Sequence, residues 1–195
     1  MSVLKNFRTN ICVLLVVLVG LAMNVSAAEH VLNPIADTFV RDGWNAEENY
    51  GTVESLELKW ESDREGMTRI AFITFDISDI SSVERAKLRL YVEWADQLEV
   101  RELAVWDMTG FEWSENELTW ESAPSEGGSL ITYLGVPNIP DIWYDVDVTS
   151  ILKDHVEEGA STFTVRIENI SDHWGGLVNI TSREGANPSQ LVIVD

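Results

Sequence analysis

A succession of short apolar or alternating runs, separated by turn residues, constrains the fold of this chain more than any other feature. The runs are rich in Val, Ile, Thr and aromatic residues, a composition typical of β-strands. We therefore expect strands at 38–41, 55–60, 69–77, 86–94, 99–106, 129–134, 143–148, 162–168, 177–180 and 190–194.

The run 86–94 places Leu88 and Leu90 on one face and Lys87 and Arg89 on the other, so only one side covers a core. Ten such strands are too many for one open sheet. The sequence predicts an all-β fold, a two-sheet antiparallel β-sandwich of jelly-roll type. One short helix is expected, from residue 148 or 149 to 157, with Asp147 as N-cap.

The first 28 residues resemble an export signal. Lys5 and Arg8 precede an apolar stretch, 11–23, which is followed by small residues, and no acidic residue occurs among them. The stretch is shorter than the roughly 20 residues that cross a bilayer. We expect a secretory signal peptide at 1–28, cleavage after Ala27 or Ala28, and a secreted, extracellular protein with no membrane partner after cleavage. A retained membrane anchor is the alternative.

The expected mature chain is one β-sandwich domain at 29–195, because no linker, repeat or change in composition divides it. It lacks cysteine, since the single Cys, Cys12, lies in the signal segment. The whole chain has 13 basic and 33 acidic residues and a formal charge of −20, and loss of Lys5 and Arg8 makes this −22. Such an acidic protein is a poor nucleic-acid binder, because nucleic-acid affinity depends on basic patches.

Motifs for catalysis or metal binding are sparse. The sequence contains no phosphate-binding glycine loop, no zinc spacing and no Gly-x-Ser-x-Gly elbow. Asp145 and Asp147 point to the same side of a predicted strand, so a structural Ca²⁺ there is one hypothesis, and hydrogen-bonded turn and cap roles are the other. His173 and Tyr50 are candidate bases only if the domain is a small polysaccharide lyase or hydrolase.

Several segments along the chain together resemble a known family, carbohydrate-binding module family 96, also called the DNRLRE domain. The matching segments are ADTFVRDG (36–43), NYG (49–51), LELK (56–59), RIAFITFDIS (69–78), AKLRLYV (86–92), WSENELTW (113–120), DVT (147–149), SRE (182–184) and LVIV (191–194). The resemblance implies a secreted, non-catalytic jelly-roll module that binds acidic polysaccharides such as alginate. It also implies polysaccharide-degrading enzymes as associates.

An acidic sugar polymer needs fixed cations for its carboxylates and aromatic faces for its rings. We predict that ligand-binding residues gather in one groove, with Lys59 on an outward face. The cationic and tyrosine candidates are Arg41, Tyr50, Lys59, Arg69 and Arg183. The alternative is that each Arg pairs with a nearby acid such as Asp42, Asp76 or Glu184.

The eight Trp residues divide into two groups. Trp44 and Trp174 lie in polar, glycine-containing loops and are expected to be exposed for stacking on sugars. Trp113 and Trp120 are expected to fill the core around a long loop, because Leu118 and Pro124 accompany them. A structural or adhesive module that contacts cell-envelope proteins is the remaining alternative function.

Overall fold

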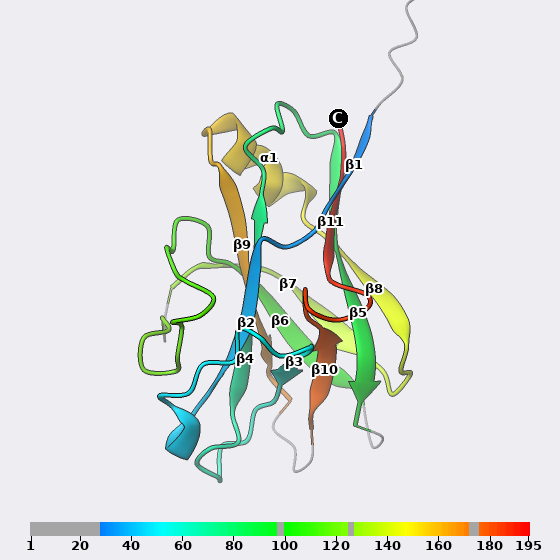
Figure 1. Cartoon of the computed structure of the whole chain (residues 1–195). Helices are drawn as coiled ribbons and strands as arrows, with labels where there is room; N and C mark the ends of the chain where they lie inside the picture. The colour runs from blue at the N-terminus through cyan, green and yellow to red at the C-terminus, as the bar shows by residue number, and fades with distance from the viewer. Residues whose placement is uncertain (1–27, 97–99, 125–126, 172–175) are drawn as a thin grey trace, which may run out of the picture.

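The computed structural model describes residues 28–96, 100–124, 127–171 and 176–195, which form two antiparallel sheets packed face to face (Figure 1). The first sheet has the order β1 (Glu29–Leu32), β11 (Gln190–Val194), β5 (Arg85–Ala95), β10 (Val178–Thr181) and β3 (Ser55–Leu58), with β8 (Ile142–Asp147) also paired to β5. The second has the order β2 (Ala36–Arg41), β4 (Arg69–Asp76), β9 (Thr162–Asn169), β6 (Arg101–Asp107) and β7 (Ser129–Val136). The predicted all-β sandwich is confirmed.

Each of the ten expected strands is present with small shifts at its ends, and one strand, β1, was not predicted. β1 pairs with β11 along its whole length, from Glu29 opposite Val194 to Leu32 opposite Leu191. The backbone N–H of Asp195 donates to the carbonyl of Ala28 at 3.2 Å. Residues 28 and 195 therefore lie side by side at one end of the sandwich (Figure 1).

Alternation along the strands fills the space between the sheets. On β5, Leu88, Leu90 and Val92 are fully buried in the main core, and the residues between them are only half-buried. From the second sheet, Phe75 and Phe163 enter the same core. This burial is the main source of stability in a domain without disulfides, because apolar surface removed from water contributes about 25 cal/mol per Å².

β4 is apolar on both faces because it is covered on both. Ala71, Ile73 and Phe75 face the main core, whereas Phe72 joins Val40 and Leu118 in a second cluster on the outer face of the second sheet. The segment 108–124, named here the covering loop, supplies Leu118 to this cluster together with Phe111, Trp113 and Trp120. Trp113 and Trp120 pack against this cluster around a long loop, as expected, but both side chains remain half-buried.

The only α-helix among the described residues, α1 (Thr149–Glu157), follows β8 as predicted. The N-cap is Val148 and not the predicted Asp147, but the carboxylate of Asp147 accepts the backbone N–H of Thr149 at 2.9 Å. Leu152 is buried in the main core. The chain leaves the helix through Gly159, whose φ of 78° is favourable for glycine. Within the described residues, no helix is both long and apolar enough to cross a membrane.

Candidate functional site

Three basic residues form a row at the end of the sandwich where β2 and β3 end and β4 begins. Arg41 of β2 is the direct cross-strand partner of Arg69 of β4. Lys59, the residue after β3, bridges Arg69 from the other side with two backbone hydrogen bonds, of 3.2 and 2.7 Å. Because directly opposed residues project to the same side of a ladder, the three cationic side chains are neighbours. The two sheets join at this row.

Two of the three cations are already paired with acids. The Lys59 ammonium lies 3.0 Å from Glu61, and these side chains are only 7% and 6% exposed. The Arg69 guanidinium lies 2.8 Å from Glu57. Burial lowers the pKa of Arg69, the Glu57 carboxylate opposes that change, and the charge of Arg41 adds to the lowering. The expectation that Lys59 lies on an outward face is wrong, because β3 ends by turning into the junction between the sheets.

Arg41 differs from its two neighbours. Its Nε donates to the carbonyl of Gly66 at 2.7 Å. Among the described residues no carboxylate lies within ion-pair distance of its guanidinium. Arg41 is half-buried, so its charge is the one in this row left for another molecule.

A pocket of about 380 Å³ opens beside the row, within the range of roughly 300–1,000 Å³ typical of ligand sites. Trp60 and Trp120 line it, and Trp60 is 39% exposed. The other lining residues are Lys59, Thr68, Arg69, Ile70, Glu168, Asn169 and Ile170. We call it the strand-end pocket. It combines aromatic surface with charged and amide groups, the mixture of contacts that a sugar requires.

The remaining predicted site residues are divided between this end of the sandwich and other places. Tyr50 stacks on Phe39 of β2, with ring centroids 4.3 Å apart, and Phe39 lies two residues before Arg41 on that strand. Trp44, in the 3-10 helix η1 (Gly43–Asn45) that follows β2, is 89% exposed, as expected. Trp174 and His173 lie outside the described residues.

Arg183 is not part of the row. It follows β10 and lies beside Asp37, four residues before Arg41 on β2. Its side chain donates to Glu115 at 2.6 Å, and its backbone N–H donates to Asp37 at 2.8 Å. The predicted single groove therefore divides into a cationic row and a separate acidic cluster around Arg183.

The acidic cluster consists of Asp37, Glu115 and Glu184. One carboxylate oxygen from each lies within 4.8 Å of the others. Asp37 is 1% exposed, and its backbone N–H donates to Glu115 at 2.8 Å. Burial, together with the charges of Glu184 and Glu115, raises the pKa of Asp37 to about 7, although the hydrogen bond from Arg183 opposes this.

The two aspartates considered for Ca²⁺ in the sequence have protein partners. Asp145 lies 2.7 Å from the Lys87 ammonium and 3.0 Å from Arg89 Nε, and Asp147 accepts the N–H of Thr149 at 2.9 Å. This geometry favours hydrogen-bonded roles over a calcium site at these two residues.

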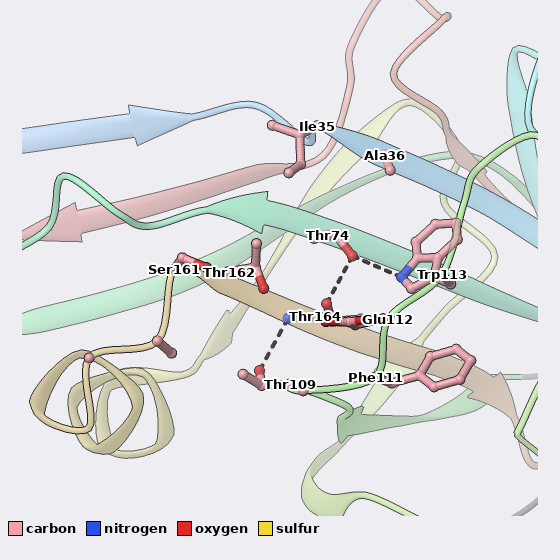
Figure 2. Close-up of a pocket in the computed structure, with 13 residues that line it drawn as sticks. Ile35, Ala36, Thr74, Thr109, Phe111, Glu112, Trp113, Ser161, Thr162 and Thr164 are labelled. Atoms are coloured by element: carbon pink, nitrogen blue, oxygen red, sulfur yellow. Dashed lines mark hydrogen bonds between the residues drawn. The ribbon is translucent and has the colours of Figure 1, made fainter.

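A larger pocket of about 550 Å³ lies where the covering loop leaves the second sheet, beside the segment that follows α1. Figure 2 shows Thr74 hydrogen-bonded both to Thr164, at 2.9 Å, and to the indole N–H of Trp113, at 3.1 Å. The hydroxyl of Thr109 accepts the backbone N–H of Thr164 at 3.2 Å, and no basic side chain lines this pocket. The strand-end pocket, which has basic and aromatic lining, is the better match to the predicted groove.

Sequence reasoning did not select Trp60 or Glu168 as site residues. Trp60 follows Lys59 at the end of a predicted strand. This pair of an aromatic and a basic residue was the one sequence signal that could have indicated a sugar-binding position. Glu168 of β9 comes beside the pocket only through its pairing opposite Ile70 of β4, more than 90 residues away in sequence.

The model of carbohydrate-binding module family 96 matches residues 28–195, which include both sheets and the strand-end pocket. The chain belongs to carbohydrate-binding module family 96. Membership places it among carbohydrate-binding modules and agrees with the resemblance described from the motifs.

A gellan lyase from Bacillus sp. contains a segment similar to this family 96 module. The two are 24% identical over 132 residues, which is 66% of this chain. The chain spans about 5% of the length of that lyase. The similarity therefore concerns one segment of a much larger enzyme.

Proposed function

We propose that this family 96 module is exported, does not catalyse a reaction, and binds an acidic polysaccharide at the strand-end pocket. The observation that carries the proposal is the row of Arg41, Arg69 and Lys59 beside a pocket lined by Trp60 and Trp120.

Each group in the site has a defined role in this proposal. The indole of Trp60 is flat and apolar on its faces, so it stacks on the C–H surface of a sugar ring. Arg41, whose guanidinium has no acidic partner among the described residues, binds a sugar carboxylate through two parallel N–H···O contacts. Arg69 and Lys59 are paired with Glu57 and Glu61, and these ion pairs hold the row in place beside Arg41.

The acidic character of the rest of the protein opposes such a ligand at long range. The formal charge is −20. At physiological ionic strength, however, the Debye length is about 8 Å, and interactions between exposed charges farther apart than this are largely screened. At that salt concentration a polymer carboxylate inside the pocket interacts mainly with the cationic row. Binding of an acidic glycan is therefore compatible with the overall charge.

Isothermal titration of residues 28–195 with alginate and gellan, and with dextran as a neutral polymer, tests the proposal. We expect binding to an acidic polymer, a loss of at least tenfold in affinity for Trp60→Ala and Arg41→Ala, and no loss for Arg85→Ala. Arg85 is a suitable control because it is exposed and lies at the opposite end of β5. Melting temperatures verify that each variant is folded.

Each other result has a distinct meaning. Binding of dextran alone contradicts the acidic ligand class. Unchanged affinity in both pocket variants places the binding site elsewhere on the module. Absence of binding across a broad glycan array favours a structural or adhesive role with cell-envelope proteins.

The segment shared with a gellan lyase supports an accessory role beside polysaccharide-degrading enzymes. Incubation of the isolated module with gellan or alginate should release no unsaturated or reducing ends. Release of such ends, reduced by a substitution of Tyr50, would instead show that the module is itself a lyase or hydrolase.

A further inference from the structure

The acidic cluster brings together three segments that are far apart in sequence. Asp37 lies on β2, Glu115 on the covering loop, and Glu184 in the turn after β10. The hydrogen bond from the Asp37 N–H to Glu115 spans 78 residues, and the bond from the Arg183 N–H to Asp37 spans 146 residues. The cluster is therefore a junction between β2 and two connecting segments.

One oxygen of this junction has no partner. Oδ2 of Asp37 accepts the N–H of Arg183, but Oδ1 is buried and accepts no hydrogen bond from any described residue. A buried carboxylate oxygen without a donor is costly, because it has lost its water and gained nothing in return. Asp37 is 1% exposed, and this oxygen belongs to the same carboxylate that meets Glu115 and Glu184.

The charges at the junction are also unbalanced. The three carboxylates carry three negative charges when ionised, and Arg183 is the one cation that contacts them among the described residues. Arg183 lies 2.6 Å from Glu115 and 3.8 Å from Glu184. Two negative charges remain, which is the charge that one divalent cation neutralises.

We propose that Asp37, Glu115 and Glu184 bind a calcium ion. Carboxylate oxygens are the ligands that Ca²⁺ prefers, and its flexible coordination suits ligands supplied by a strand and two connecting segments. The partly exposed side chain of Glu184 gives water access to the site, so water completes the shell. Mg²⁺ is a poorer fit because it requires nearly ideal octahedral geometry.

The ion would act on the covering loop. Glu115 is already held by Asn49, whose side-chain amide donates to its carbonyl at 2.8 Å. Gly51 permits this close approach, since a side chain there would collide with the same carbonyl. A calcium ion would add a bond from the loop to β2 and to the turn after β10. This inference concerns the stability of the loop and does not rest on glycan binding.

Thermal unfolding and calcium titration of residues 28–195 at pH 7.5 test the site. In wild type we expect 1:1 calorimetric binding of Ca²⁺ and, at about a hundredfold excess over Kd, a rise in melting temperature of about 5 °C that a chelator reverses. Asp37→Asn and Glu184→Gln should each reduce calcium affinity at least tenfold. Glu117→Gln, a change in the same loop outside the cluster, should not.

Two results would overturn the proposal. The weakest calcium modules have a Kd of about 1 mM. If Ca²⁺ at concentrations up to about tenfold above this value produces neither a heat of binding nor a change in melting temperature, the junction is stabilised by a proton and Arg183 instead. If Asp37→Asn and Glu184→Gln both keep the wild-type response to Ca²⁺, the ion binds elsewhere. Glu184→Gln alters a partly exposed side chain, so it remains informative even if Asp37→Asn does not fold.

Discussion

At the scale of single residues, the buried ion pair of Lys59 and Glu61 lies where the backbone bridge between Lys59 and Arg69 joins the two sheets. Removing one partner of such a pair leaves an uncompensated charge, which usually costs about 3–5 kcal/mol. Arg64 also lies 3.2 Å from Glu61 and offsets part of that cost. We therefore expect Lys59→Met to lower the free energy of unfolding by about 2–4 kcal/mol in urea denaturation.

The double variant Lys59→Met/Glu61→Leu provides the control, because it removes both charges. It should recover most of the lost stability, since a well-packed apolar pair often replaces a buried ion pair at little cost. A single variant as stable as wild type but without glycan affinity would show that Lys59 serves the ligand directly and not the fold.

At the scale of elements, the covering loop depends on the outer cluster beneath it. Leu118 is 4% exposed and packs with Val40 and Phe72 of the second sheet. Leu118→Ala should leave a cavity and lower the free energy of unfolding by about 2–4 kcal/mol. Because Trp120 follows two residues later and lines the strand-end pocket, calorimetry should also show weaker glycan binding. Leu88→Ala, in the main core, should reduce stability without changing the affinity of the folded module.

The edge strand β8 is held to β5 in part by Asp145, which contacts Lys87 and Arg89. Burial raises the pKa of Asp145, but hydrogen bonds from Lys87 and Arg89 outweigh this and lower it below 3.8. The folded state thus favours the ionised form of Asp145. Its contribution to stability is therefore present above pH 3.8 and is lost as pH falls through the pKa of the folded state.

The pH dependence of that contact is measurable by comparing melting temperatures of wild type and Asp145→Asn. The group is partly exposed, so wild type should be more stable by only about 0.5–1 kcal/mol at pH 7. The difference should shrink as pH falls below 3.8 and disappear once Asp145 is protonated in the folded state as well. A constant difference at all pH values would exclude the charge of Asp145 as its cause.

For the whole molecule, the net charge predicts an unusual salt dependence of binding. At about 0.01 M salt the Debye length is roughly 30 Å, so the acidic surface repels an acidic polymer. At about 0.15 M it is near 8 Å, and we expect affinity for that polymer to rise severalfold before falling again near 1 M. Dextran titrated over the same range serves as the neutral comparison. A steady decline in acidic-polymer affinity from the lowest salt would show that the repulsion is unimportant.

The sequence contains enough local information for the strands but not for the site. Alternation on β5 and the continuous apolar run of β4 are visible because each reflects which faces are covered. The prediction that Lys59 faces outward was wrong because its burial results from a bridge to Arg69, which forms only when the two sheets join. The grouping of Asp37, Glu115 and Glu184 likewise depends on how the covering loop packs, which no local pattern records.

The pairing of β1 with β11 has a practical result for the orientation of this module. Residues 28 and 195 meet at one end of the sandwich, and the loops beside the strand-end pocket are at the other (Figure 1). If the module is attached to a surface through either residue, the proposed binding end points away from that surface, so immobilised copies should remain accessible to long polymers.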